Sequence, residues 1–553
     1  MSGNRKRQRG PSPAATGPNQ GTPRLPAWLE RRSIVLAVGL VLLASVRIVS
    51  TYTVFNHTMD EPAHIACGME WLDRGVYRWE PQHPPLARVF TAAGPYLLGM
   101  RSQGTPNTDL LSMWREGTAI LYRGQRYDLT LSLARLGILP FFWMACAAVY
   151  VWGRRLFGRA VAVLGLFPFT FLPPVLAHAG LATTDMALTG TLAAAFVAGM
   201  GWLERPSVKA AAAFGALSGL MTLSKFSGLV FFPAAAAIAL AGYFAAARPG
   251  WREVVGAVRV RLATFGLAVV VGCLVVWAGY RFSFGEIGFA HLRLPAPELF
   301  AGLEQVRQHN ATGHPAYLLG ARSQTGFWAY YLVALGVKTP LAFLALLGIG
   351  VAALWRKRER SARPWTPLAF SAGILLVAMF SHINIGIRHI LPIYAGLSVT
   401  AAVGLARMLE SGTGRKWVAW AGAVLALWLA ASSLWSHPDY LPYFNELAGS
   451  QPEKILVDSD LDWGQDHKRL ERRLDELGVK DVSFDRYLYD DPIWHRGFPM
   501  VHRLDKAAPS VGWNVVGVSL WKTTDLVEWP DRFEPRERVG KSFLLWYFEP
   551  PPR

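Results

Sequence analysis

The sequence has 553 residues, enough for several soluble domains, but only 17% of them are charged, compared with about 25% in soluble domains. Hydrophobic residues reach 52%, and 22 tryptophans are typical of a chain with membrane interfaces. A net charge of +18 would fit a nucleic-acid-binding protein, but the basic residues lie in short patches between apolar runs, such as Arg154-Arg155 and Arg356-Lys357-Arg358. Membrane orientation explains such patches, so we expect a lipid bilayer as partner and no nucleic acid.

The chain begins with a polar tail. Residues 1–27 are rich in Pro, Gly, Ser and Arg, which predicts a disordered basic segment. The first apolar run, 33–55, is too long for a cleaved signal peptide and follows Arg31 and Arg32. These features predict an uncleaved signal anchor with its N-terminus in the cytoplasm. We expect the protein to lie in the cytoplasmic membrane.

Further apolar runs are long enough to cross the membrane, which requires roughly 20 residues for about 30 Å of hydrocarbon. With the first run they predict eleven helices in an all-α transmembrane domain over 28–436, the others at 129–151, 156–177, 184–203, 209–224, 227–247, 262–280, 327–355, 366–382, 388–407 and 416–436.

The apolar stretch 210–247 requires a separate decision. As one helix it would be about 57 Å long at 1.5 Å per residue, too long for the bilayer. Lys225, Ser227 and Gly228 interrupt it near the middle. We therefore predict a hairpin of two helices.

The distribution of Lys and Arg predicts the orientation. With the N-terminus inside, the cytoplasmic loops are all basic, at 153–159, 204–209, 248–261, 356–363 and 407–416. The opposite loops, 56–127 and 281–325, contain more acidic and aromatic residues. Eleven spans then leave residues 437–553 on the external side.

Residues 437–553 are polar and predict a small external α/β domain. Strand-like runs occur at 454–457, 482–487, 515–520 and 543–548, and an amphipathic helix at 465–477 places Leu470, Leu474 and Leu477 on one face. The acidic segment 458–466 could bind a cation or a sugar. Because Asp and Ser commonly cap a following helix, we favour a structural role for it.

The loop 56–127 contains the most informative residues. Pro62 suits the first turn of a helix that Asp60 or Glu61 would cap, and His64 lies on the same helical face as both acids. Taken alone, this is equally the pattern of a well-capped interfacial helix. A second cluster, His83-Pro84-Pro85-Leu86-Ala87-Arg88, follows some twenty residues later.

Together these motifs resemble the first luminal loop of the protein O-mannosyltransferases and their bacterial relatives, which are membrane glycosyltransferases of the C-type fold. That family has Lys where this chain has Arg88, so the charge is retained but the geometry of a phosphate contact differs. The segment around Asp185 resembles the second acidic site of the superfamily, which includes the lipid A aminoarabinose transferases. Arg388-His389-Ile390-Leu391-Pro392 resembles its Arg-x-x-Leu-Pro segment.

The resemblance, which covers residues of about 33 to 400, implies an inverting hexosyltransferase. It would move mannose or a similar sugar from a polyprenyl-phosphate donor to a hydroxyl of a protein, glycan or lipid acceptor. Since phosphate leaves without a proton, one base is enough, whereas a glycosidase also needs an acid. We predict Asp60 as that base and Glu61 as the residue that orients Asp60 or the acceptor, with proximity raising the pKa of one carboxyl.

Cations are needed to stabilise the departing phosphate. Arg388 is the first candidate and Lys225 and Arg88 follow, although each side chain could instead extend to the lipid headgroups. The other predicted substrate-binding residues are His64, His83, Asp185 and His389. Such groups can hold a lipid monophosphate without a divalent ion, so we expect no obligatory metal or other cofactor. Cys67, Cys146 and Cys273 also lack metal-ligand or redox spacing.

Two other classes of protein compete with an enzyme. A transporter or lipid flippase predicts ionisable residues in the middle of spans and favours internal repeats, whereas here most charges lie at span ends and no repeat is found. The sequence alone leaves open an inactive scaffold whose tail binds a partner.

Overall fold

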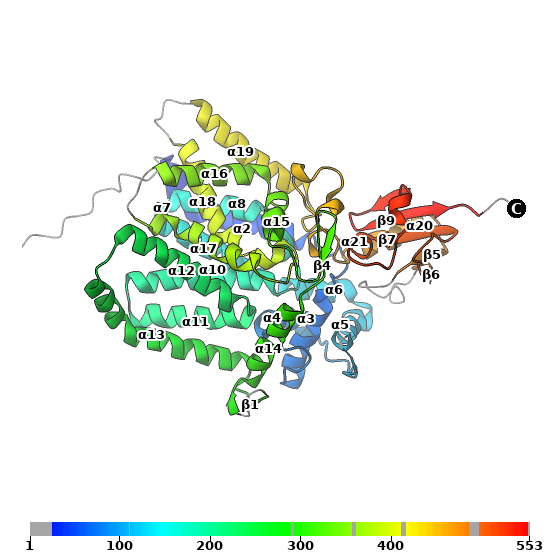
Figure 1. Ribbon diagram of the computed structural model, residues 1–553, viewed down its shortest axis with the longest axis horizontal. Helices are drawn as coiled ribbons and strands as arrows, with labels where there is room; N and C mark the ends of the chain where they lie inside the picture. Colours follow the sequence, from blue (N-terminus) through cyan, green and yellow to red (C-terminus); the bar gives the residue numbers. More distant parts are fainter. Residues whose placement is uncertain are drawn as a thin grey trace, which may run out of the picture.

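The computed structural model describes residues 25–109, 111–288, 292–356, 361–410, 416–485 and 497–550. Long helices run side by side, and a small sheet domain projects from one end of their bundle, here called the domain end (Figure 1). Most of the predicted tail 1–27 lies outside the described residues. So do residues 357–360 and 411–415 of two predicted basic loops and residues 486–487 of the predicted strand 482–487.

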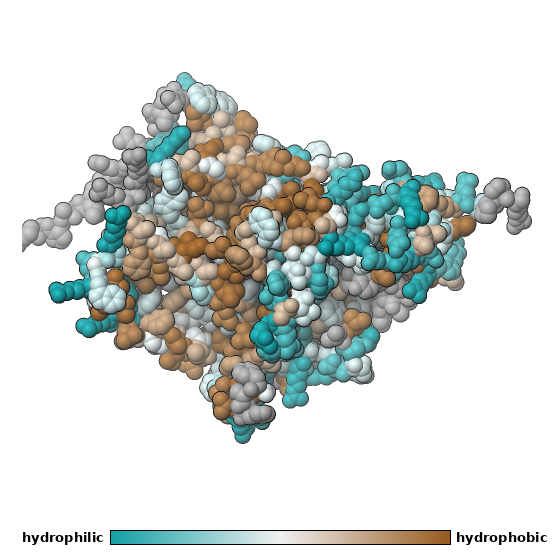
Figure 2. All heavy atoms as spheres, viewed as in Figure 1, coloured by the Kyte–Doolittle hydropathy of each residue, from teal (hydrophilic) through white to brown (hydrophobic). Residues whose placement is uncertain are grey.

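An apolar helix occurs at each predicted span. These helices are α2 (Ser33–Val49), α7 (Leu139–Phe157), α8 (Arg159–Phe171), α10 (Asp185–Glu204), α11 (Val208–Ser224), α12 (Gly228–Ala247), α13 (Trp251–Gly279), α16 (Leu341–Arg356), α17 (Thr366–Met379), α18 (Ile393–Met408) and α19 (Lys416–Trp435). Apolar residues cover the middle of the visible face, and hydrophilic residues gather at the sheet domain and at the opposite end (Figure 2). The chain is a polytopic membrane protein.

The number of complete spans remains a prediction. Within the described residues, five helical segments are long and apolar enough to cross a membrane, or up to seven if two bent pairs each form one span. The bent pairs are α8 with α9 (Pro173–Ala179), at 69°, and α15 (Tyr330–Lys338) with α16, at 110°. Pro173 and Pro340 lie at the two bends, where proline removes a backbone donor and interrupts the helical ladder.

The predicted hairpin within 210–247 is confirmed, because α11 ends at Ser224 and α12 begins at Gly228. The predicted loop 248–261 is largely wrong. Helix α13 already begins at Trp251, and its arginines lie on exposed helical turns. A charged turn outside the hydrocarbon region need not end a helix, so α13 extends to about 44 Å at 1.5 Å per residue.

Glycines allow the helices to pack closely. A Cβ atom on Gly350 of α16 would lie 2.1 Å from the carbonyl oxygen of Thr400 in α18. A Cβ on Gly215 of α11 would lie 2.2 Å from that of Ala268 in α13. Larger side chains at these positions would force the helix pairs apart.

Two long connections lie near the domain end (Figure 1). The first contains α3 (Asp60–Met69), the π-helical turn η1 (Glu70–Arg74), α4 (Pro85–Leu97) and α5 (Ser112–Tyr122), and leads through η2 (Arg123–Gln125) into α6 (Tyr127–Leu136). The second contains the hairpin of β1 (Phe284–Ile287) and β2 (Leu292–Pro295), then α14 (Pro297–Thr312) and the hairpin of β3 (Ala316–Leu318) and β4 (Ala321–Ser323).

The sheet domain has five described strands in the order β6-β5-β7-β9-β8. They are β5 (Asp481–Phe484), β6 (Met500–His502), β7 (Gly512–Gly517), β8 (Glu537–Val539) and β9 (Phe543–Phe548). Strand β5 pairs in parallel with β6 and β7, and the remaining pairs are antiparallel. The predicted amphipathic helix is confirmed as α20 (His467–Glu476), which buries Leu470 and Leu474.

Two predicted strands differ from the structure. No strand forms at 454–457, where a short 3₁₀ turn, η6 (Pro452–Lys454), leads into irregular chain. The predicted strand 515–520 ends at Gly517 and continues as α21 (Val518–Thr523). Leu456 and Val457 of the first segment and all of 515–520 are buried, and burial alone does not distinguish a strand from a short helix.

Candidate functional site

Four charged side chains from distant parts of the chain meet near the domain end. Asp60 and Asp185 are the first residues of α3 and α10, Lys225 lies between α11 and α12, and Arg388 lies in the 3₁₀ turn η4 (Ile387–Ile390). Arg388 Nη1 donates to Asp60 Oδ2 at 3.0 Å and lies 3.9 Å from Asp185 Oδ2. Lys225 Nζ donates to Asp185 Oδ1 at 2.6 Å. We call these four residues the open cluster.

The members of the open cluster differ in their access to solvent. The Asp60 side chain is 28% exposed, that of Arg388 10%, and that of Asp185 only 1%. Asp185 therefore acts as the buried counter-ion of both cations, and Asp60 is the carboxylate that an incoming molecule can reach. All four are among the site residues predicted from the sequence, and the structure brings them together.

Glu61 is enclosed in a different ion pair. Arg135 of α6 donates to it through Nε at 2.9 Å and Nη2 at 2.8 Å. The backbone N–H groups of Thr58 and Ala182 donate at 2.7 and 2.8 Å, and the side chain has no exposed surface. Although burial alone would raise the pKa of Glu61, the Arg135 guanidinium and these hydrogen bonds hold it below its usual value.

These contacts correct two expectations. The pKa of Glu61 is lowered, because its nearest charged neighbour is the Arg135 cation and not the Asp60 carboxylate. The start of α3 has no side-chain cap from Asp60; instead Glu61 accepts the hydrogen bond from the N–H of Thr58.

Arg88 is also enclosed. Its Nε donates to His64 Nδ1 at 3.0 Å, its Nη1 to the Tyr77 hydroxyl at 2.9 Å, and its Nη2 to the Glu80 carboxylate. The residue is 1% exposed and its guanidinium is occupied by these partners, so the contact of Arg88 with a phosphate stays a prediction that the structure does not support. The planar guanidinium reaches several acceptors at once, which a lysine ammonium would not reproduce. Glu61, Arg135, His64, Glu80 and Arg88 form what we call the closed cluster.

The predicted histidines are not free cations. His83 Nδ1 lies 3.1 Å from Glu80 Oε2, and its ring meets that of His64 edge-on at 5.4 Å. Burial and the neighbouring Arg88 lower the pKa of His64 well below its usual value. His389 is stacked on Tyr331 and packed edge-on against Phe231. His64 is therefore neutral at pH 7 and supplies no charge to bind phosphate.

Arg135, the partner of Glu61, is not among the site residues predicted from the sequence. Its signal was an arginine within an otherwise apolar helical run, which normally implies a buried partner. Asp458 and Trp463, which lie near Arg388, were not predicted at the site either. These two follow the last membrane helix, and no local pattern connects them with residues so distant in sequence.

Within the described ranges, no group of three or more His, Cys, Asp or Glu side chains is arranged to hold a metal ion. Independence from a metal remains a prediction.

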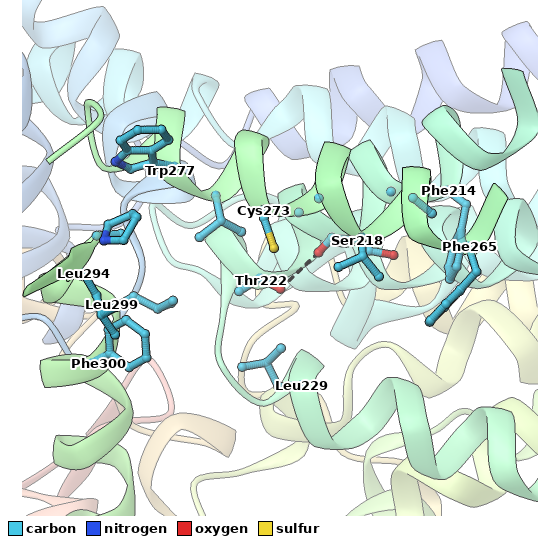
Figure 3. A pocket seen from close by; sticks show the side chains of 18 residues that line it. Phe214, Ser218, Thr222, Leu229, Phe265, Cys273, Trp277, Leu294, Leu299 and Phe300 are labelled. Carbon is cyan, nitrogen blue, oxygen red and sulfur yellow. Dashed lines mark hydrogen bonds between the residues drawn. The ribbon is translucent and has the colours of Figure 1, made fainter. Parts of the chain in front are cut away.

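An apolar groove of about 540 Å³ lies between α11, α13 and residues 294–300 (Figure 3). Its lining includes Phe214, Ser218, Thr222, Leu229, Phe265, Cys273, Trp277, Leu294, Leu299 and Phe300. Two lining residues, Thr222 and Leu229, lie within four residues of Lys225 along the chain, on either side of the turn between α11 and α12. A groove with this lining suits a hydrocarbon chain.

No protein-family model and no curated protein sequence matches the chain. Among solved structures, ArnT from Cupriavidus metallidurans bound to undecaprenyl phosphate is similar with 14% identity and a TM-score of 0.51, over 92% of this chain and 97% of that one. The apo form of that ArnT gives 17% identity, 75% and 67% coverage, and a TM-score of 0.49.

The archaeal oligosaccharyltransferase AglB from Archaeoglobus fulgidus, in complex with an inhibitory peptide and a dolichol-phosphate, gives 11% identity, 88% and 69% coverage, and a TM-score of 0.48. The likeness to the undecaprenyl phosphate complex shows that this chain has the C-type glycosyltransferase fold, as its first loop predicts.

Proposed function

We propose that this chain of C-type glycosyltransferase fold is an inverting glycosyltransferase that uses a polyprenyl-phosphate sugar as donor. The observation that carries the proposal is the open cluster, in which one reachable carboxylate, Asp60, lies beside the Arg388 cation, and a second cation, Lys225, lies close by. One base and two cations are the groups that this reaction requires.

In the proposed reaction, the acceptor hydroxyl oxygen attacks the anomeric carbon of the sugar from the side opposite the phosphate. Asp60 takes the hydroxyl proton as the new carbon–oxygen bond forms. The bond to the phosphate oxygen breaks at the same time, and the phosphate leaves with the electron pair. Arg388 and Lys225 stabilise the resulting negative charge, and the anomeric configuration is inverted.

The apolar groove supports a lipid-linked donor. Its lining residues Thr222 and Leu229 flank the turn that contains Lys225, and we propose that a polyprenyl chain in the groove brings its phosphate toward the open cluster from there. The solved ArnT of the same fold is bound to undecaprenyl phosphate, a lipid of this class. For the sugar we propose mannose or a similar hexose, and for the acceptor a hydroxyl of a protein, glycan or lipid.

The external face is the proposed side of the reaction. The open cluster lies near the domain end, and the turn between α12 and α13, which contains Arg248 and leads to Arg252 in the first turn of α13, lies at the opposite end of the bundle (Figure 1). Basic segments are retained on the cytoplasmic side, so this distribution favours an external site in a cytoplasmic membrane protein.

The test is a transfer assay with the full chain in lipid nanodiscs, labelled polyprenyl-phosphate hexoses and candidate acceptors. We expect Asp60→Asn to lower turnover by about 10²- to 10⁴-fold, the usual contribution of a general base, with binding of undecaprenyl phosphate retained. Asp109→Asn is the matched control, because Asp109 is an exposed acid of the same connection that pairs with Arg115.

Two results would oppose the proposal. Transfer by Asp60→Asn at the wild-type rate would remove Asp60 as the base. A wild-type protein that binds no polyprenyl phosphate and transfers no sugar from any donor would exclude the enzyme class proposed.

A further inference from the structure

A segment beyond the last membrane helix reaches the open cluster. It begins with the 3₁₀ turn η7 (Asp458–Asp460) and continues to Trp463. Ser459 Oγ accepts a hydrogen bond from Arg388 Nε at 3.1 Å. The Trp463 ring lies under the Arg388 guanidinium, with 4.1 Å between its centroid and the guanidinium carbon. Arg388 is thus held from one edge and one face by this segment.

The same segment is bonded to the backbone next to both members of the Asp60–Arg388 pair. Asp460 Oδ1 accepts from the N–H of Ile387 at 3.0 Å, and Ser459 Oγ donates to the carbonyl of Ile385 at 2.7 Å. The carbonyl of Trp463 accepts from the N–H of Met59 at 3.0 Å. The segment therefore sets the separation of the loop before α3 from η4.

The packing at this contact is tight. Ser459, Asp460 and Trp463 are buried. Gly386, with φ of +83°, faces the segment, and a Cβ atom there would lie 2.6 Å from Ser459 Oγ. A glycine with this backbone conformation permits the close approach that the Ser459–Arg388 hydrogen bond needs.

The alternative role expected for this segment, capping of the following helix, is wrong. Among the described residues no side chain caps α20, and Asp466, the residue before it, accepts from Ser542 Oγ at 2.8 Å instead. Ser459 and Trp463 make their contacts with η4 and with the loop before α3, and not with α20.

We propose that Ser459 and Trp463 are positioning residues that fix the Arg388 guanidinium for the donor phosphate, so that the C-terminal region completes the reaction centre. This inference rests on the proposed function, which assigns the phosphate to Arg388. A cation over an indole face is held more strongly as the contact is desolvated, and here Trp463 is buried and only 10% of the Arg388 side chain is exposed. Ser459 adds direction, because its Oγ and the Ile385 carbonyl to which it donates both accept from Arg388 Nε, and together they fix the plane of the guanidinium.

The experiment measures binding of undecaprenyl phosphate to the full chain in nanodiscs, with kcat and KM for transfer as a second readout. Trp463→Leu and Ser459→Ala are each made with Arg388 present and with Arg388→Ala. We expect each to weaken binding roughly tenfold when Arg388 is present, the effect of losing one such contact to a buried cation. In the Arg388→Ala protein neither change should weaken it further, because the group being positioned is gone.

Two controls separate positioning from folding. Trp463→Phe keeps an aromatic face and should retain most of the affinity. Arg322→Ala removes contacts between the β3–β4 hairpin and the carbonyls of Trp521 and Lys522 in the C-terminal region, away from Arg388, and should leave binding unchanged.

Each outcome decides between the two proposals. Losses that are equal in the Arg388 and Arg388→Ala backgrounds would mean a structural role and overturn the inference, as would wild-type affinity in both Trp463→Leu and Ser459→Ala. In those cases transfer by the wild type and its loss in Asp60→Asn would leave the proposed function intact. If the wild type neither binds the lipid phosphate nor transfers sugar, the proposed function fails and the inference fails with it.

Discussion

Asp60 and Glu61 are neighbours in the first turn of α3, but they belong to opposite kinds of ion pair. Asp60 pairs with Arg388 in the open cluster and keeps 28% of its side chain exposed. Glu61 pairs with Arg135 in the closed cluster and has no exposed surface. Successive residues on a helix point about 100° apart, so one faces the site and the other faces the protein interior. An acidic pair in a sequence is therefore not necessarily a pair of cooperating carboxylates.

The closed cluster holds the first long connection in place. Glu61 connects α3 to α6 and to the chain before α10, while Arg88 connects α4 to α3 and to Glu80. Buried ion pairs add little net stability, but removing one partner leaves an uncompensated charge in a place without water. Substitutions in the closed cluster should therefore impair folding, whereas substitutions in the open cluster should impair turnover.

The largest expected effect is the loss of folding stability in Glu61→Gln. The change leaves the Arg135 guanidinium buried without its counter-ion, which costs about 3–5 kcal/mol. We expect loss of folded protein, measured as the yield of monodisperse protein and its thermal midpoint in detergent, whereas Asp60→Asn should retain both. A Glu61→Gln protein that is stable but has no turnover would give Glu61 a role in the reaction, and would contradict the distinction between the closed and the open cluster.

The next effect concerns Asp458, at the border of the open cluster. Burial raises the pKa of Asp458 to about 6 from an ordinary value of 3.8, although Arg388 acts in the opposite direction. A raised carboxyl pKa stabilises the folded state fully below pH 3.8, and that stabilisation is lost as the pH rises through 6. Asp458→Asn should therefore be more stable than the wild type at pH 7.5, by about 1–3 kcal/mol.

The measurement is the thermal midpoint of both proteins between pH 4 and pH 8, where the difference should shrink toward the acid end. Asn is a suitable replacement because Asp458 has φ of +60°, a conformation that Asn tolerates. A difference that stays constant across this range would mean that Asp458 does not titrate there.

The smallest effect should come from a substitution that fills the apolar groove. It sharpens the comparison because it tests substrate access to the open cluster and changes neither cluster. Cys273 is exposed on α13 and lines the groove, so Cys273→Trp can occupy it without disturbing the core. We expect KM for a long-chain donor to rise about 3- to 10-fold, corresponding to about 1 kcal/mol, with kcat and thermal midpoint unchanged.

A donor with a ten-carbon chain and the Cys273→Ala variant serve as controls. The KM of Cys273→Trp for the short donor should equal that of the wild type, and Cys273→Ala should have the wild-type KM for the long-chain donor. An equal rise in KM for the short and long donors would place the hydrocarbon chain outside this groove.

Much of the architecture could be predicted locally. Runs of apolar residues locate the helices because burial in hydrocarbon depends on composition and length, and Lys225 with Gly228 marked the turn between α11 and α12. Helix ends were less accurate, as at Trp251, because charged residues outside the membrane do not stop a helix. The bends at Pro173 and Pro340 depend on packing as well as on proline, which explains why single spans were predicted there.

By itself, the sequence determined that the chain crosses a membrane, which charged residues gather at the ends of its helices, and that its first loop resembles those of C-type glycosyltransferases. Only the tertiary structure decided which charges share a site. Asp60 pairs with Arg388, whereas Glu61 and Arg88 are buried with other partners. Ser459 and Trp463 contact the Arg388 guanidinium from a distant part of the chain. The physical reason is that the strength of a charge–charge or cation–π contact depends on distance and on the exclusion of water, and spacing along the chain encodes neither.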